Sequence, residues 1–124
     1  MIKFLRMQGG YLLNVNEVKE IVKEVNLTRM HDDGLKRGIE AKIELQTTAG
    51  RYTFIEIFEF APLKEGEQWG YGTKGGKRAV ERVEDILDTM ITVLVDKMNE
   101  KDEKIISIGT NFLEEAMQEE VDRG

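Results

Sequence analysis

The chain of 124 residues contains no cysteine, a single serine and a single histidine. The absence of cysteine excludes disulfides, thiolate nucleophiles and cysteine metal ligands together. Ser107 lies in no nucleophile-elbow pattern, so a Ser-His-Asp triad is disfavoured. His31 stands beside Asp32 and Asp33 in a predicted turn, and although a His/Asp/Asp metal site is conceivable, adjacent residues rarely converge on one ion. We therefore expect no catalytic residues, no metal and no cofactor.

Long apolar runs are also missing. No stretch approaches the roughly 18 apolar residues of a membrane span, and the longest, from Met90 to Val95, is interrupted by Thr92. The segment from Met1 to Arg6 lacks the apolar region of a signal peptide. These features predict a cytoplasmic protein with no membrane partner.

Basic charge is the minority sign, since 18 basic residues face 24 acidic ones and the net charge is −6. An acidic chain is repelled by the phosphate backbone, so we expect no long nucleic acid as partner, although a local basic patch could exist. Hydrophobic residues make up 40% of the chain, enough to build a core. The length is typical of one domain, and we assign residues 1–124 to it.

The first half of the chain has the period of β-strands. Gly9 and Gly10 separate two short alternating runs, which is a hairpin signal. The stretch 17–25 fits either one helical face or a turn followed by a strand that continues to Met30. We favour the turn and strand, because β-branched residues dominate and no C-cap follows.

The strongest strand pattern covers residues 39–46 and restarts at 52–60. Apolar residues alternate with charged ones in the first run, which is typical of an antiparallel sheet with one face in water. Pro62, the only proline, ends the strand region. The acidic residues of these runs are read as the solvated face: Glu40, Glu44, Glu56 and Glu59.

The second half of the chain is helical. A long helix is expected from Lys77, with a heptad-like apolar seam and a second apolar face. One face can cover the sheet, and the other predicts a second helix or a second subunit, so we expect a homo-oligomer. Residues 105–109 form a short strand or a connector, and a shorter helix follows from Thr110 or Asn111.

This order predicts an α+β fold: an N-terminal antiparallel β-meander of about five strands, followed by a long helix and a shorter C-terminal helix. Within the single domain, the sheet part covers residues 1–62 and the helical part covers 77–124. Between them, residues 63–76 form a glycine-rich basic loop.

The segment 68–78 holds the candidate site. It contains the motif Gly70-x-Gly72-x-x-Gly75 and opens a helix, whose free N–H groups favour anions. Trp69 and Tyr71 could stack on a base. Two alternatives stay open, namely a flexible linker and a protein-contact loop. The predicted ligand-binding residues, including two arginines from the sheet or a neighbouring subunit, are Trp69, Tyr71, Lys74, Gly75, Gly76, Lys77, Arg78, Arg29 and Arg51.

The glycine motif matches neither of the two best-known phosphate loops. A Rossmann fingerprint directly follows a strand in a βαβ unit, and a P-loop needs Lys followed by Ser or Thr after its last glycine. The basic residues Lys77, Arg78 and Arg82 oppose the dipole at the start of the helix. A bound anion would remove this conflict.

Two family resemblances follow from these patterns. The N-terminal quarter, from Ile2 through the Gly9-Gly10 turn to Val25, resembles small flagellar-protein β modules of the FlbD type. The whole plan, a sheet followed by two helices, resembles the phage anti-Thoeris sponge family. That resemblance implies a non-enzymatic oligomer that sequesters cyclic ADP-ribose-type signals or cyclic oligonucleotides in the host cell. No family binding residue aligns with a particular position here.

Our leading hypothesis is therefore non-enzymatic sequestration of a phosphate-bearing nucleotide signal, as in a phage anti-defence protein. The alternative is a small protein-interaction module, or an inhibitor of a host protein, that acts through an acidic surface or the spare helix face. The acidic residues of the last helix could form such a surface: Glu114, Glu115, Glu119 and Glu120. A small nucleotide-directed enzyme is disfavoured, since no convincing nucleophile, metal cluster or base is present.

Overall fold

The computed structural model describes residues 2–31, 34–101 and 104–124, and it contains strands, two α-helices and one short 3-10 helix. In chain order the elements are β1 (Phe4–Arg6), β2 (Leu12–Asn14), the 3-10 helix η1 (Val15–Glu17), β3 (Glu20–Met30), β4 (Lys36–Thr47), β5 (Gly50–Pro62), α1 (Lys74–Asn99), β6 (Ile105–Ile106) and α2 (Asn111–Arg123).

The strands form two sheets. The long strands make an antiparallel meander in the order β3-β4-β5, and the short ones make a small sheet in the order β2-β1-β6. The α+β class is confirmed, but a single meander of five strands is wrong on two counts. The N-terminal hairpin leaves the meander, and a sixth strand, β6, returns after α1 to pair in parallel with β1.

The ambiguous stretch 17–25 is mostly strand, as we favoured. The turn η1 leads into β3, which pairs with β4 from Glu20, opposite Gln46, to Met30, opposite Lys36. This ladder satisfies the backbone hydrogen-bonding groups that face β4 over the whole strand, which explains why the strand forms here instead of the helical alternative. The predicted turn after His31 includes Asp32 and Asp33, which lie outside the described residues.

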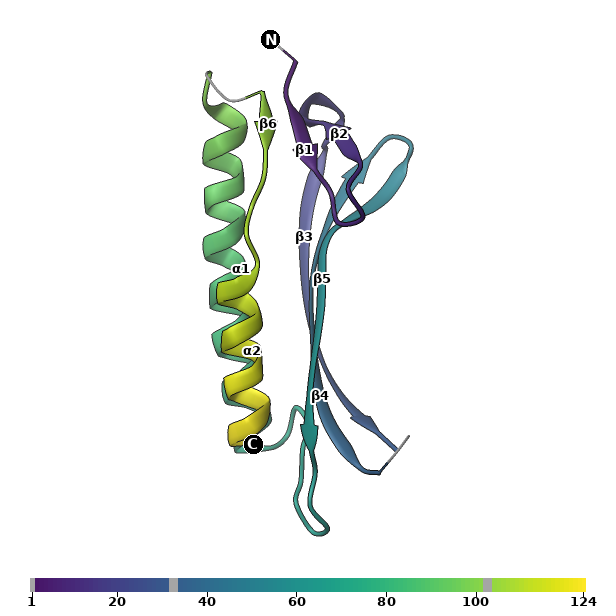
Figure 1. The fold of residues 1–124 in the computed structure, drawn as a ribbon, viewed down its shortest axis with the longest axis vertical. Helices are drawn as coiled ribbons and strands as arrows, with labels where there is room; N and C mark the ends of the chain where they lie inside the picture. The colour runs from purple at the N-terminus through teal and green to yellow at the C-terminus, as the bar shows by residue number, and fades with distance from the viewer. Residues whose placement is uncertain (1, 32–33, 102–103) are drawn as a thin grey trace.

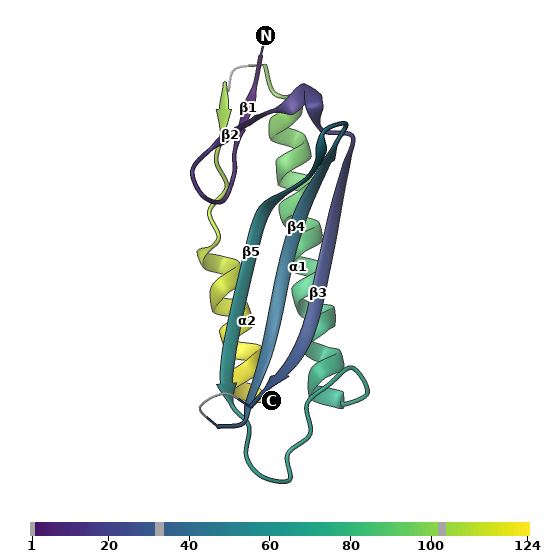
Figure 2. The same cartoon turned by 90° about the vertical axis from the view of Figure 1, so that its right-hand side faces the viewer.

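Both helices cover one face of the long sheet (Figure 1). In Figure 2, which looks onto the open face, α1 lies behind β3 and β4, and α2 lies beside β5. The residues of β4 that alternate toward the helices are fully buried, and they are Ile39, Ala41, Ile43 and Leu45. The predicted one-sided sheet is therefore confirmed, with Glu40, Lys42 and Glu44 on its open face.

Helix α1 begins at Lys74, three residues before the predicted start. Thr73 has an extended backbone and its side chain accepts a hydrogen bond from the amide of Gly76 at 3.0 Å, so it is the N-cap. A Cβ on Gly76 would collide with the carbonyl of Gly70 and lie 2.9 Å from Leu27 Cδ1. The glycines at 75–76 thus belong to the helix, where they allow close packing.

The second apolar face of α1 is only partly covered. Ala79 and Ile86 are buried, and α1 packs against α2, while Val93 and Val95 stay exposed. The homo-oligomer accordingly stays a prediction. No helix in the described parts of the chain is long and apolar enough to cross a membrane.

Candidate functional site

Trp69 is part of the core, contrary to its predicted role. Its side chain is 4% exposed, and its indole Nε1 donates a hydrogen bond to the carbonyl of Gly38 at 3.0 Å. A base can stack only on an accessible ring face, so Trp69 is unable to serve as a stacking platform in this structure. Its burial ties the loop to strand β4.

Tyr71 is the one aromatic residue of the loop that remains accessible, with 57% of its surface exposed. Its hydroxyl accepts a hydrogen bond from the amide of Leu27 at 3.0 Å and donates one to Asn26 Oδ1 at 3.3 Å. Both partners lie on the edge strand β3. The residue therefore ties the loop to the sheet while its ring faces solvent.

The predicted phosphate-binding groups at the start of α1 are largely engaged within the chain. The amide of Gly76 is bonded to Thr73, and the backbone of Gly124 lies directly against Gly75. Arg78 Nε lies 3.5 Å from Glu120 Oε1, and Glu120 is buried. Lys74 and Lys77 are exposed.

Carboxylates from α2 offset the basic start of α1. Arg82 forms an ion pair of 2.9 Å with Glu119 and lies 3.8 Å from Glu120, which also lies 3.9 Å from Arg123. The conflict with the helix dipole that suggested an anion site thus has an internal solution. The Gly76 amide is therefore no longer free to bind a ligand, and the Arg78 side chain, 42% exposed, is shared with Glu120.

The two arginines predicted from the sheet lie at opposite ends of it. Arg29 is opposite Arg37 in the β3–β4 register, near the glycine-rich loop. Arg51 follows the β4–β5 turn, where its Nε donates to Gln46 Oε1 at 3.1 Å. It lines a separate hollow of about 630 Å³ with Tyr11. Within one chain the structure does not bring Arg51 to the loop.

Arg37 is a structural residue that the sequence pattern did not reveal. Its buried guanidinium donates to the carbonyls of Val121 and Asp122, at 3.0 Å for the latter, and pairs with Glu67 at 2.9 Å. It therefore caps the C-terminal end of α2 and holds the loop at the same time. In the sequence, the one signal for Arg37 is its position just before the alternating pattern that begins at Ile39.

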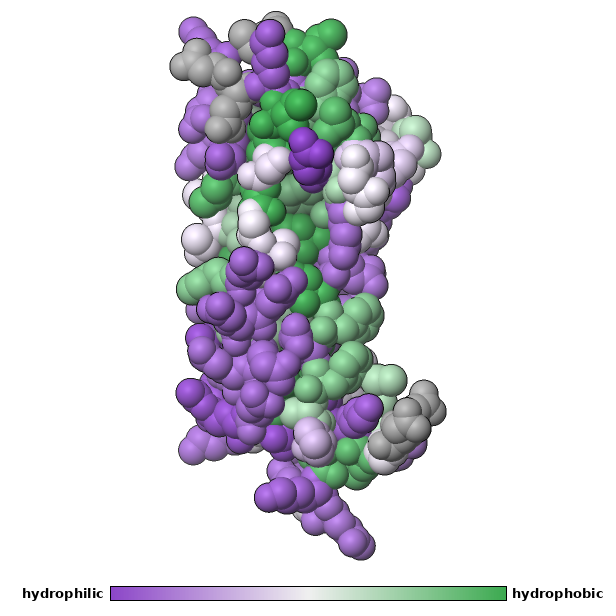
Figure 3. All heavy atoms as spheres, in the orientation of Figure 1, coloured by the Kyte–Doolittle hydropathy of each residue, from purple (hydrophilic) through white to green (hydrophobic). Residues whose placement is uncertain are grey.

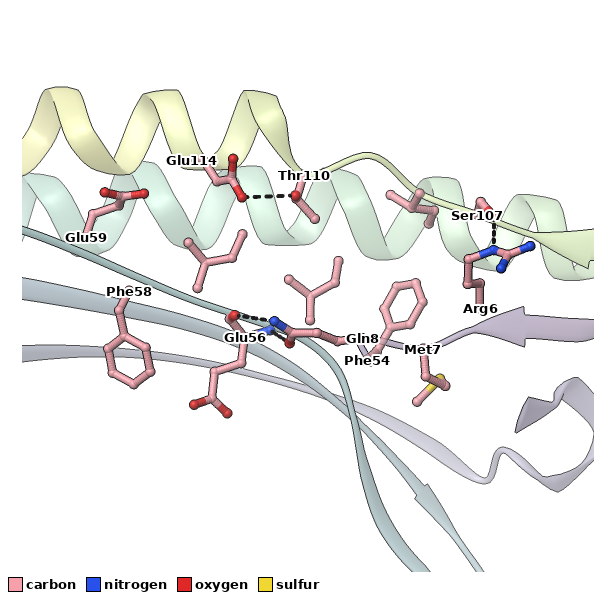
Figure 4. A pocket seen from close by; sticks show the side chains of 13 residues that line it. Arg6, Met7, Gln8, Phe54, Glu56, Phe58, Glu59, Ser107, Thr110 and Glu114 are labelled. Atoms are coloured by element: carbon pink, nitrogen blue, oxygen red, sulfur yellow. Dashed lines mark hydrogen bonds between the residues drawn. The ribbon is translucent and has the colours of Figure 1, made fainter. Parts of the chain in front are cut away.

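A second concavity, partly enclosed by the two layers, is a groove of about 420 Å³ between β5 and α2. We call it the β5–α2 groove. It opens toward the viewer in Figure 3, where an apolar floor runs between the hydrophilic surface of α2 and the sheet. Four segments line it: residues 6–8, residues 54–59, residues 107–110 and Glu114. Figure 4 shows these side chains.

One wall of the groove is the outer edge of β5, which pairs with no strand in the described residues beyond the short contact with Gln8. The Gln8 amide donates to the carbonyl of Phe54 at 3.2 Å. The Gln8 side chain then binds both backbone groups of Glu56, accepting from its amide at 2.6 Å and donating to its carbonyl at 2.9 Å. The carboxamide thus stands where the peptide group of a neighbouring strand would stand.

The other wall is acidic. Thr110 Oγ1 donates to Glu114 Oε1 at 3.3 Å, and Glu59 extends from β5 toward the same helix. Burial raises the pKa of Glu59, and the nearby carboxylates of Glu114 and Asp122 raise it further. A cation beside Glu59 would relieve this crowding of negative charge.

The far end of the groove carries its one basic residue, Arg6, whose Nε donates to Ser107 Oγ at 3.1 Å. The floor is formed by Ile55, Ile57 and Ile108. An apolar floor with a few polar groups at its rim is typical of a binding site. In the described residues, no group of three or more His, Asp or Glu side chains is placed to hold a metal ion.

Comparisons of the chain with protein-family models, with curated proteins and with solved structures found no match in any of the three. The groove could not be found as a motif, because its residues come from segments about 50 residues apart. The one sequence signal it carries is the alternating pattern of β5, which marks a strand but says nothing about its free edge.

Proposed function

We propose that the protein is a non-catalytic interaction module that binds an extended segment of another protein. The segment would add to the outer edge of β5 as a fourth strand of the long sheet. The observation that supports this is the Gln8 carboxamide, which satisfies both backbone groups of Glu56 as a paired strand would. Strand addition of this kind is a common mode of peptide recognition.

The alternation of the strand extends this edge beyond Gln8. Backbone groups of every second residue point to the same side of an antiparallel strand. Since both groups of Glu56 point outward, those of Phe58 and Phe60 do as well. Phe58 lies opposite Glu40 and Phe60 opposite Gly38, so the register continues without a break. Two N–H and two C=O groups are thus presented for pairing.

The helical layer leaves room for the added strand. Packed helices lie about 8–10 Å apart, and neighbouring strands about 4.8 Å apart, so two helices span roughly the width of a four-stranded sheet. In Figure 2, α2 passes behind β5, and its N-terminal part lies on the side of β5 away from β4. A segment paired with β5 would therefore lie in the groove beside the N-terminal part of α2.

Binding without catalysis fits the state of the polar groups in the groove. Gln8 is bonded to Glu56, Ser107 to Arg6, and Glu114 to Thr110. Each of these groups already has a structural partner. They can therefore shape the rim of a binding site, whereas none is set up as a nucleophile with an adjacent base.

The edge can be tested with a proline. In Phe58→Pro the lost N–H points away from β4, so the β4–β5 ladder should stay intact while strand addition is blocked. Phe58→Ala removes the ring but keeps the N–H and is the matched control. We expect peptides selected from a randomised ten-residue library on the wild type to lose at least tenfold in affinity on the proline variant and much less on alanine.

Nuclear magnetic resonance locates the same event. Titration of a selected peptide into ¹⁵N-labelled protein should shift the amides of Phe58 and Phe60 most. Equal affinity of both variants, or shifts confined to Tyr71 and Lys74, would contradict strand addition at this edge.

Nucleotide sequestration is a second candidate, favoured by the exposed ring of Tyr71 beside Lys74 and Lys77, which are exposed in the first turn of α1. A thermal-shift screen with cyclic ADP-ribose isomers and cyclic oligonucleotides tests it. Ligand at 100 times its dissociation constant adds about 2.7 kcal/mol to stability. The shift should vanish in a Lys74→Ala/Lys77→Ala variant, and no shift with any nucleotide removes this candidate.

A further inference from the structure

We infer that the partner strand carries a lysine or arginine opposite Glu59, with apolar side chains two residues before and after it. This inference rests on the proposed strand addition and names the chemistry of its partner. The basic side chain would lie between β5 and α2, in the β5–α2 groove.

The register of β5 places this position. Side chains alternate between the two faces of a strand, and paired residues share a face. Ile57 and Ala61 are buried under the helices, and Glu59 lies between them in the same alternation. The partner residue opposite Glu59 therefore faces α2, together with the residues opposite Ile57 and Ala61.

Helix α2 supplies the charge above that position. Glu114, Gln118 and Asp122 are spaced by four residues and share one side of the helix, and Gln118 Nε2 donates to Asp122 Oδ1 at 2.9 Å. Glu114 lines the β5–α2 groove together with Glu59, so this side faces β5. The opposite side of α2 carries Glu120, which is engaged with α1.

Among the residues that the structure describes, no ion pair joins a basic side chain to Glu59, Glu114 or Asp122. Arg6 lies at the other end of the groove, and its Nε is bonded to Ser107. Arg37 reaches the end of α2, but it contacts backbone carbonyls there, and its ion pair is with Glu67. A cation from the partner would thus lie near Glu59 and Glu114, which both line the partly desolvated groove, where such pairing is stronger than on an open surface.

The flanking positions call for apolar side chains. The residue opposite Ile57 would lie on the floor that Ile55, Ile57 and Ile108 form. The residues between, opposite Phe58 and Phe60, would face the open side of the sheet beside two stacked rings whose centroids are 6.1 Å apart. β-Branched residues suit those positions.

The occupant is a separate basic partner rather than a second copy of this chain. Two copies paired edge to edge through β5 would bring both Glu59 side chains and both acidic sides of α2 together. Like charges across a strand pair are destabilising. The charge of the edge therefore selects against self-pairing and in favour of a basic strand.

Synthetic peptides provide the test. The probe is a fluorescein-labelled peptide with the core Thr-Val-Thr-Lys-Thr-Val-Thr, which reads the same in both chain directions. Two further peptides replace the lysine with norleucine, which keeps the apolar stem, or with glutamate. Fluorescence anisotropy should show the lysine peptide binding at least tenfold more tightly than norleucine, and no binding of glutamate.

A charge swap is the matched control. Glu59→Lys should reverse the preference, so that the glutamate peptide binds and the lysine peptide does not. N-methylation of the peptide's edge-facing amides should abolish binding of every peptide, because it removes the backbone hydrogen bonds without changing the side chains.

The possible outcomes separate the two levels of the proposal. Equal binding of the lysine and norleucine peptides, still sensitive to N-methylation, overturns the basic specificity and leaves strand addition in place. Failure of all the peptides, together with failure of library selection, overturns strand addition itself. A dimer of the protein alone that the Phe58→Pro variant dissociates would show that a second copy occupies the edge, and this would also overturn the inference.

Discussion

The glycine-rich loop and the β5–α2 groove differ in whether the residues that suit a ligand are free to bind one. The loop has aromatic, basic and glycine residues in one short segment, yet Trp69 is buried and Arg78 is paired with Glu120. The groove has no motif, yet its strand edge and its acidic wall are open. Residues that suit a ligand are thus equally suited to internal contacts, and only their partners decide which use prevails.

The largest effect should come from Trp69→Ala. Loss of a buried indole leaves a cavity and an unpaired Gly38 carbonyl, so we expect the free energy of unfolding to fall by about 3–5 kcal/mol. Urea denaturation measures it. Trp69→Phe is the control that keeps most of the volume. A nearly neutral Trp69→Ala would return this residue to the accessible surface and restore the loop as a stacking site.

Arg37→Met tests the residue that joins the loop to α2. It removes three hydrogen bonds, two of them to the last turn of the helix, and leaves those carbonyls without their donor. We expect a loss of about 2–4 kcal/mol. Arg29→Met, at the opposite register position but exposed, should change stability by less than about 0.5 kcal/mol. Equal effects of the two substitutions on stability would show that Arg37 does not hold the loop and α2 together.

Gly76→Ala tests the close approach of loop and helix. Alanine is the better helix former by about 1 kcal/mol, but its Cβ would collide with the Gly70 carbonyl. A net loss of about 1–3 kcal/mol is expected. Gly72→Ala, with open space around the added carbon, is the control and should be within about 0.5 kcal/mol. A stabilised Gly76→Ala protein would mean that the loop moves freely.

The smallest effect concerns the groove. The pKa of Glu59 is raised above its ordinary value of 4.5 by burial and by Glu114 and Asp122. The folded state therefore holds this proton more tightly than the unfolded state, and stability falls as the pH rises through the raised pKa. Glu59→Gln removes that loss, so near neutral pH the variant should be more stable than the wild type, by no more than about 0.5 kcal/mol. Its melting temperature should be correspondingly higher.

The difference should disappear well below pH 4.5, where Glu59 is protonated in both the folded and the unfolded state. Thermal melts across this range measure it. A Glu59→Gln variant less stable than the wild type at neutral pH would show that Glu59 already has a cationic partner within the fold.

Much of the fold could be predicted because periodicity depends on local sequence. The alternation in β4 and β5, the long α1 seam and the stop at Pro62 all appear in the structure. The start of α1 was misplaced by three residues, since a Thr followed by glycines is a weaker start signal than an apolar repeat. The pairing of β6 with β1 was missed because it joins segments about 100 residues apart.

The candidate site was less predictable for the same reason. Local sequence showed which residues carry charge and rings, and Tyr71, Lys74 and Lys77 are indeed exposed. It could not show that Glu120 would come to Arg78, or that Gln8 would pair with the edge of β5. Those contacts depend on which strand lies at the edge and on which side of it α2 lies.

The amino-acid sequence by itself determined the periods of the strands and helices, the excess of acidic charge and the absence of cysteine chemistry, because each is a property of residues near one another in the chain or of their totals. Only the tertiary structure decided which basic groups are neutralised and which strand edges stay unpaired. Such availability depends on contacts between distant segments, and a strand presents the same backbone groups whether they are paired or free.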